Sequence, residues 1–158
     1  MKKLLTSILT MTTLIGSLSA SAVTGNVKNL IGGTVKVTED FTIEANTALK
    51  AFKYGGPRGR QILNHHTDCG VILKNEFYED QTFLAQEKSY LIESVEVTMI
   101  TTGRGPLYTA KIKLQNTNYI SHIECKRIMN EISAEGVQSA FGDYLEVNYP
   151  EQHFDGSL

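Results

Sequence analysis

The chain has 158 residues, with 17 acidic and 15 basic side chains and no block of like charge. This balance argues against nucleic acid and against anionic membrane surfaces as partners. The absence of tryptophan argues against sugar binding through stacked indole rings.

The first 22 residues have the pattern of a bacterial secretory signal peptide. Two lysines follow Met1, an apolar run extends from Leu4 to Ile15, and the segment ends in Ala20-Ser21-Ala22. The apolar run is shorter than the roughly 20 residues that cross a bilayer. We therefore expect cleavage after Ala22, no membrane insertion afterwards, and a periplasmic or secreted protein. The remaining segment, 23–158, has the length of a single domain.

The first part of this segment is predicted to form short strands. Apolar and polar residues alternate at 34–38 and 41–45, and less regularly at 48–54. The run 55–60, Gly-Gly-Pro-Arg-Gly-Arg, is predicted to be an exposed loop. It lacks the Lys-Ser/Thr of a phosphate-binding loop, and Pro57 removes a backbone donor. Its Arg58 and Arg60 suit an acidic patch on a protein partner.

The middle of the chain has the clearest strand patterns. The run 69–73 places Cys69, Val71 and Leu73 on one face. The runs 90–100 and 107–115 are expected to form a hairpin through the glycine-containing loop 101–106. The turn at 116–118 leads into a third strand of this meander, which ends at Cys125.

After Arg127 the spacing of apolar residues changes from the alternation of a strand to the spacing of a helix, so a short helix is expected there. Ser133 can cap it, and Val137, Ala140 and Phe141 share one helical face. Gly142 can end it in the left-handed conformation, before a last strand at 144–147. About eight short strands and one short C-terminal helix predict an all-β, mainly antiparallel fold, either a β-sandwich or a small barrel.

The two cysteines are expected to form a disulfide. Exported proteins favour such bonds, and both Cys69 and Cys125 lie at ends of apolar strand runs. A bridge between them would close a loop of 55 intervening residues. The chain-entropy model assigns such a loop about 4 kcal/mol of stabilisation.

The order of these features resembles that of small uncharacterised exported bacterial β-proteins with one disulfide. The residues concerned are Cys69, the hairpin 95–114, the run 123–125 and the run Phe-Gly-Asp-Tyr-Leu at 141–145. The resemblance covers most of the segment after the signal peptide and implies no activity.

The histidines suggest two alternative metal-binding sites. The runs 66–69 and 122–125 share the form His-x-x-Cys, so His66, His122 and the two cysteines match the ligand inventory of structural zinc. A disulfide would consume both thiols, and residues three apart on a strand face opposite sides. The other possibility places His65, His66 and Asp68 on a loop beside an intact disulfide.

No pattern in the sequence indicates a catalytic residue or a cofactor. Neither cysteine stands in a known catalytic signature or a Cys-x-x-Cys pair, and no Gly-x-Ser-x-Gly elbow occurs. The favoured function is a non-enzymatic exported β-domain that binds an envelope or extracellular protein, or acts as an inhibitor. The alternative is a small metal-binding protein or hydrolase centred on the His65–Cys69 loop. The oligomeric state is left open.

Overall fold

A computed structural model describes residues 25–58, 66–85 and 89–150 of the chain. The predicted signal peptide and its cleavage site lie outside the described residues, as do Arg60 and His65. No helix in the described ranges is long and apolar enough to cross a membrane.

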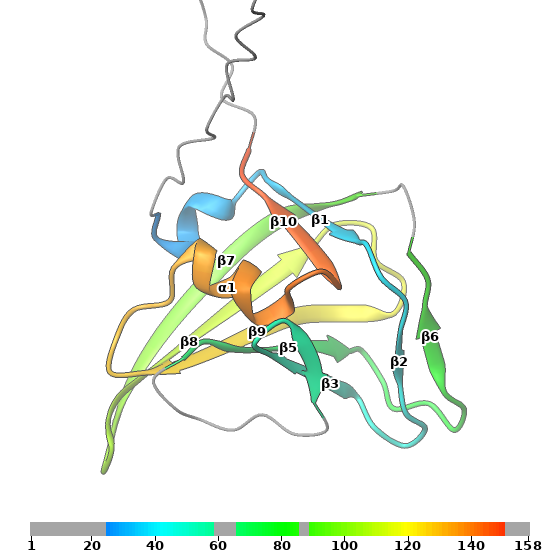
Figure 1. Cartoon of the computed structure of the whole chain (residues 1–158), viewed down its shortest axis with the longest axis horizontal. Coiled ribbons are helices and arrows are strands. Elements are labelled where there is room, and N and C mark those ends of the chain that lie inside the picture. Colours follow the sequence, from blue (N-terminus) through cyan, green and yellow to red (C-terminus); the bar gives the residue numbers. More distant parts are fainter. Residues whose placement is uncertain (1–24, 59–65, 86–88, 151–158) are drawn as a thin grey trace, which may run out of the picture.

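Eight strands form one antiparallel sheet that curls into a half-barrel (Figure 1). Their order is β10-β1-β7-β8-β9-β5-β3-β4. The bounds are β1 Thr34–Val37, β3 Leu49–Lys53, β4 Gly56–Arg58, β5 Asp68–Leu73, β7 Ser89–Thr102, β8 Gly105–Leu114, β9 Ile120–Ile128 and β10 Leu145–Asn148. A separate pair consists of β2 (Phe41–Ile43) and β6 (Gln81–Phe83). The all-β class and the β7–β8–β9 meander are confirmed.

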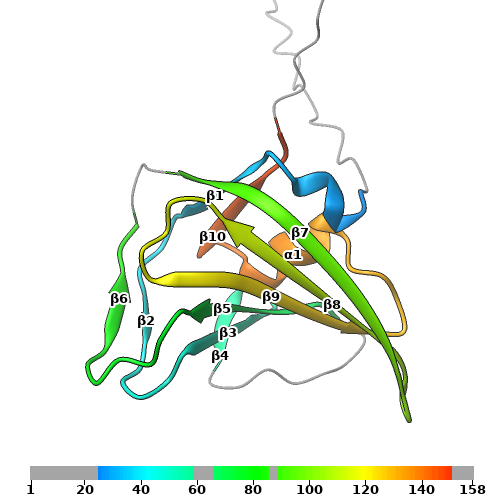
Figure 2. The ribbon, with the colours of Figure 1, turned by 180° about the vertical axis from the view of Figure 1, so that it is seen from behind.

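The concave face of the sheet carries the core, because alternate residues of each strand point to it. One row of paired residues crosses five neighbouring strands, in the order Phe52, Cys69, Cys125, Ala110 and Val97. The first four members of the row are at most 1% exposed. Figure 2 shows the opposite, convex side, which β7, β8 and β9 dominate.

Helix α1 (Ala134–Phe141) lies on the concave side of the sheet (Figure 1). Ser133 caps it by accepting a hydrogen bond from the Gly136 N–H at 3.1 Å, as predicted. The predicted face, formed by Val137, Ala140 and Phe141, is buried. Burial of this face against the strands stabilises a helix too short to persist alone in water.

Gly142 ends α1, but not in the left-handed helical conformation expected from the sequence. Its φ of 59° and ψ of −125° are those of the first central residue of a type II′ turn, closed by Tyr144 N–H to the Phe141 carbonyl. A Cβ at this position would lie 2.4 Å from Gly55 Cα. The Gly55 N–H also donates to the Ala140 carbonyl at 3.2 Å. The end of α1 is therefore packed backbone to backbone against the β3–β4 turn.

The other side of α1 protects the edge strand β10. The Gln138 amide accepts a hydrogen bond from Val147 N–H at 2.7 Å and donates to the carbonyls of Leu145 at 3.0 Å and Gly142 at 2.8 Å. An unprotected edge strand exposes backbone groups of this kind. Helix α1 thus connects the two edges of the sheet, β10 through Gln138 and β3–β4 through Gly142.

The first and last described segments meet at Glu135. The Gly25 N–H and the Tyr149 hydroxyl both donate to Glu135 Oε1, each at 3.1 Å. A 3-10 helix, η1 (Val27–Leu30), which was not predicted from the sequence, follows Gly25.

Parts of two predicted loops belong to strands. Gly56–Arg58 forms β4 rather than loop, because an edge strand tolerates a proline that cannot donate. The turn before β4 is Tyr54-Gly55, whose φ values of 52° and 76° fit a type I′ hairpin. At the β7–β8 hairpin, strand pairing continues to Thr102 and Gly105, which leaves only two residues between them.

Candidate functional site

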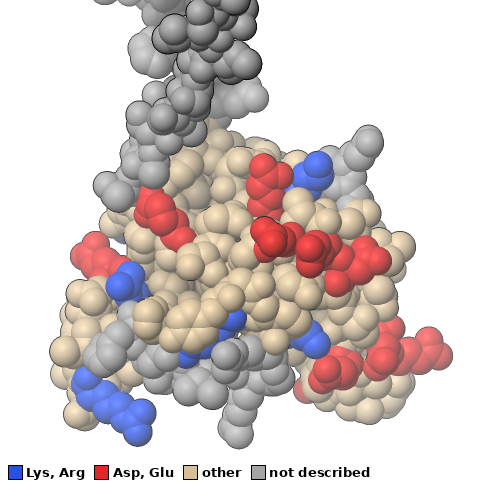
Figure 3. All heavy atoms as spheres, viewed as in Figure 1, with Lys and Arg blue, Asp and Glu red and all other residues tan. Residues whose placement is uncertain are grey.

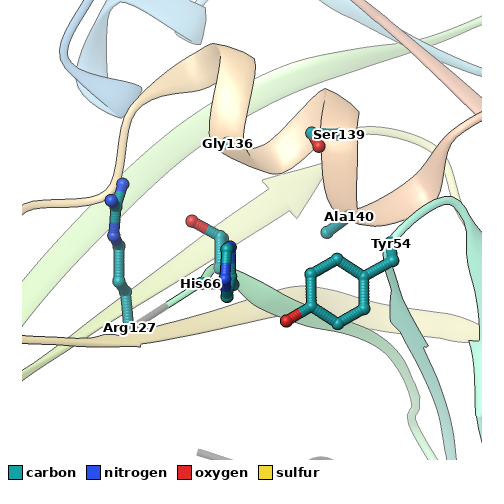
Figure 4. Close-up of a pocket in the computed structure, with 7 residues that line it drawn as sticks. Tyr54, His66, Arg127, Gly136, Ser139 and Ala140 are labelled. Atoms are coloured by element: carbon teal, nitrogen blue, oxygen red, sulfur yellow. The ribbon is translucent and has the colours of Figure 1, made fainter. Parts of the chain in front are cut away.

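A pocket of about 100 Å³ lies between α1, the β3–β4 turn, the start of β5 and the end of β9 (Figure 4). Five of its residues carry polar side chains, and the other two form the wall on α1. The lining residues are Tyr54, His66, Thr67, Arg127, Gly136, Ser139 and Ala140. The pocket therefore draws on four segments that are distant in the sequence.

Two aromatic rings form one side of the pocket. Tyr54 occupies the positive-φ position of the β3–β4 turn, and its ring lies edge-on to His66 with centroids 4.9 Å apart. The Lys53 ammonium lies 5.1 Å from the centroid of the Tyr54 ring, within cation–π range. Tyr54 remains 57% exposed, so its ring forms the rim and not the floor.

Arg127 forms the opposite side. It lies on β9 two residues after Cys125, so both side chains leave the strand on its concave face. Figure 4 shows Arg127 and Tyr54 on opposite sides of His66, beneath the helix turn that carries Gly136 and Ser139. A guanidinium group is thus placed where the strand pattern would otherwise supply an apolar core residue.

The Thr67 hydroxyl lies at the inner wall and lacks a hydrogen-bond partner among the described residues. Thr67 is 7% exposed, and its Oγ1 is fully buried. A buried hydroxyl without a partner costs about 1–3 kcal/mol. A Cβ at Gly136 would lie 2.6 Å from Thr67 Oγ1, which is closer than a normal contact. The Thr67 hydroxyl therefore fits at this position because residue 136 is a glycine.

An ion pair lies directly behind the Tyr54–His66 side. Lys53 Nζ and Asp68 Oδ1 are 3.2 Å apart, and both side chains are nearly inaccessible to solvent. Removing one partner of such a pair typically costs about 3–5 kcal/mol, because the other charge stays buried. The pair fixes the end of β3 and the start of β5, from which Tyr54 and Thr67 project.

The two cysteines are bonded to each other. Cys69 and Cys125 pair directly across β5 and β9, with Cα atoms 4.0 Å apart and both side chains fully buried. The predicted disulfide is confirmed, so neither sulfur is available as a zinc ligand or a nucleophile. A structural disulfide indicates folding in an oxidising, non-cytoplasmic compartment.

The structure separates the remaining candidate ligands. His122 lies on β9 next to Ser121, whose Oγ is 3.0 Å from its Nδ1, and not beside His66. Burial lowers the pKa of His122 below its ordinary value, with nearby Lys111 and Lys113 acting in the same direction and Glu124 opposing them. The described ranges contain no group of three or more His, Cys, Asp or Glu residues that could hold a metal ion. The loop site that includes His65 stays a prediction.

Sequence reasoning selected His66 but missed Tyr54, Thr67, Arg127 and Ser139 as members of one site. Arg58, predicted to lie in a loop, belongs to β4, and its role in partner binding stays a prediction. One local feature of the sequence could have indicated the site. Ile123, Cys125 and Arg127 are alternate residues of one strand and face the same side, and a basic residue at such a core-facing position indicates an internal polar site.

Comparisons with known proteins give no relative for this chain. No protein family, no curated protein and no solved structure matches it.

Proposed function

We propose that this protein is an exported, non-enzymatic binding module of the bacterial periplasm or exterior. Its pocket beneath α1 receives a single protruding group of an envelope or extracellular protein. The signal-peptide pattern at residues 1–22 and the Cys69–Cys125 disulfide support export.

The volume of the pocket carries this proposal. Sites for whole small molecules usually occupy about 300–1,000 Å³. A space of about 100 Å³ accommodates one functional group and not a complete metabolite. The rest of such a ligand must then lie on the surrounding surface, as the surface of a protein partner would.

The composition of the rim supports a protein partner. Tyrosine and arginine are enriched among the residues that dominate protein–protein binding energy. Tyr54 stands exposed at one side of the pocket, and Arg127 lines the other. The type I′ turn and the contact of Gly55 with α1 hold the backbone that carries Tyr54.

The test compares capture by wild-type protein and by two tyrosine variants. Purified 23–158 serves as bait for exported proteins of the native host. Tyr54→Ala removes the rim ring, and Tyr78→Ala is the matched control because Tyr78 is 94% exposed and outside the pocket lining. We expect a partner that wild type and Tyr78→Ala retain and Tyr54→Ala loses. Equal capture by both variants would contradict a binding site at this pocket.

A further inference from the structure

We infer that the group received by the pocket is a protein carboxylate, held by the Arg127 guanidinium and the Thr67 hydroxyl. This inference rests on the proposed function and specifies its ligand chemistry. It derives from the charges, the buried hydroxyl and the size of the site.

The described lining residues favour a negative ligand. Arg127 is permanently charged, and none of the lining residues is Asp or Glu. Figure 3 shows several Lys and Arg side chains across the middle and lower left of this face, and the β3–β4 turn lies near the middle of the same view in Figure 1. Asp and Glu are spread mainly over the upper and right-hand parts. The local field thus favours an anion at the pocket.

The Thr67 hydroxyl supplies an independent observation. It is more than nine-tenths buried, lines the pocket and has no hydrogen-bond partner within the described ranges. Its proton can be donated to a ligand oxygen, which would remove the cost of its isolation. Tyr54 and Ser139 place two more hydroxyl groups around the same space.

The balance of charge favours a carboxylate over a phosphate. Phosphorylated groups carry a charge of about −1.5 to −2 and are usually bound by clusters of arginines. The described lining contains one arginine. A guanidinium group matches the two oxygens of a carboxylate in a bidentate pair, and a carboxylate carries a single charge.

The experiment follows amide and Arg side-chain signals by NMR while probes are added to purified 23–158. Acetate and the neutral isostere acetamide test the charge. A C-terminally amidated Gly-Gly-Glu-Gly-Gly peptide and an N-acetylated Gly-Gly-Gly peptide with a free C-terminus distinguish the two protein sources of a carboxylate. We expect saturable shifts at Thr67, Gly136 and Ser139 with acetate and with at least one peptide, and none with acetamide.

Variants assign the binding to the named side chains. Arg127→Gln should weaken acetate binding about tenfold or more, and Thr67→Val should weaken it less. Lys111→Gln, which removes a cation from outside the pocket lining, should leave it unchanged. The acetate–acetamide comparison uses wild-type protein, so it remains decisive if a variant fails to fold.

Equal shifts with acetamide, unchanged binding by Arg127→Gln, or inorganic phosphate that binds more tightly than acetate would each overturn the carboxylate inference. Capture that still depends on Tyr54 would then leave the proposed function standing. Conversely, acetate binding without any Tyr54-dependent partner would contradict the proposed function alone.

Discussion

The side-chain amide of Gln138 bonds to the backbone N–H of Val147 as a peptide group of a neighbouring strand would. Its oxygen accepts from Val147 at 2.7 Å, and its nitrogen donates to the carbonyl of Leu145 two residues earlier on β10. The Gln138 side chain thereby satisfies two backbone groups of β10 that a further strand would otherwise pair with.

The first prediction concerns this edge. Gln138→Leu keeps a side chain of similar size but removes the three hydrogen bonds, and should lower the free energy of unfolding by about 1–3 kcal/mol. Gln115→Leu, at an exposed position, is the matched control and should change it by less than about 0.5 kcal/mol. Urea unfolding measures both. Equal effects would show that the amide bonds on β10 contribute nothing specific.

The second prediction concerns the disulfide. Cys69→Ala and Cys125→Ala should each destabilise the protein by about 4 kcal/mol, because each opens the same covalent loop. The double variant should resemble either single one, since only one bond is lost in every case. Urea midpoints of the three variants provide the measurement, and additive losses would contradict a shared bond.

The third prediction concerns the contact between Gly142 and Gly55. Gly142→Ala should cost about 2 kcal/mol or more, because a Cβ both disfavours the positive φ and meets Gly55 backbone. A methyl group added at Gly103 would meet no described atom within 4 Å, so Gly103→Ala is the control and should be nearly neutral. Thermal unfolding of the two variants should differ clearly, and similar midpoints would exclude a tight contact.

The hairpin and the helix were predictable because their signals are local. Alternation over 107–115 and the Ser133-to-Gly142 pattern each report the burial of one face, and the structure buries those faces. The strand at Gly56–Arg58 was missed because its pairing with β3 overrides the weak strand preference of Gly and Pro. The pocket was missed for a related reason. Tyr54 and Ser139 come together only through the packing of α1 on the β3–β4 turn, which no local pattern records.

The fourth prediction tests the space between Gly136 and Thr67. Gly136→Ala should destabilise the wild-type protein, because the new methyl group would meet Thr67 Oγ1 at 2.6 Å. In a Thr67→Ala background the clash is absent, and the same change should stabilise α1 by up to about 1 kcal/mol through helix propensity. A double-mutant cycle in urea measures this reversal of sign. Destabilisation in both backgrounds would show that Thr67 is not the obstacle.

The fifth prediction concerns acid pH and Glu135. Burial alone would raise the pKa of Glu135, but hydrogen bonds from its own N–H, Gly25, Tyr149 and Ser133 outweigh it and hold the pKa below its ordinary value of 4.5. The folded state therefore binds fewer protons than the unfolded state, and this stabilisation is present above pH 4.5 and lost as pH falls through the folded pKa. Wild type should exceed Glu135→Gln in stability at pH 7, and the difference should shrink toward pH 3. A pH-independent difference in urea unfolding would contradict it.

The meeting of Gly25 and Tyr149 at Glu135 has a consequence for redesigning the chain. Because both groups bond the same carboxylate oxygen, a short linker could join residues 25 and 149 without stretching the fold. New ends could then be opened at Gly103-Arg104, in the two-residue turn of the β7–β8 hairpin. Such a circular permutant would keep every strand pairing of the half-barrel while changing the order in which the strands are synthesised.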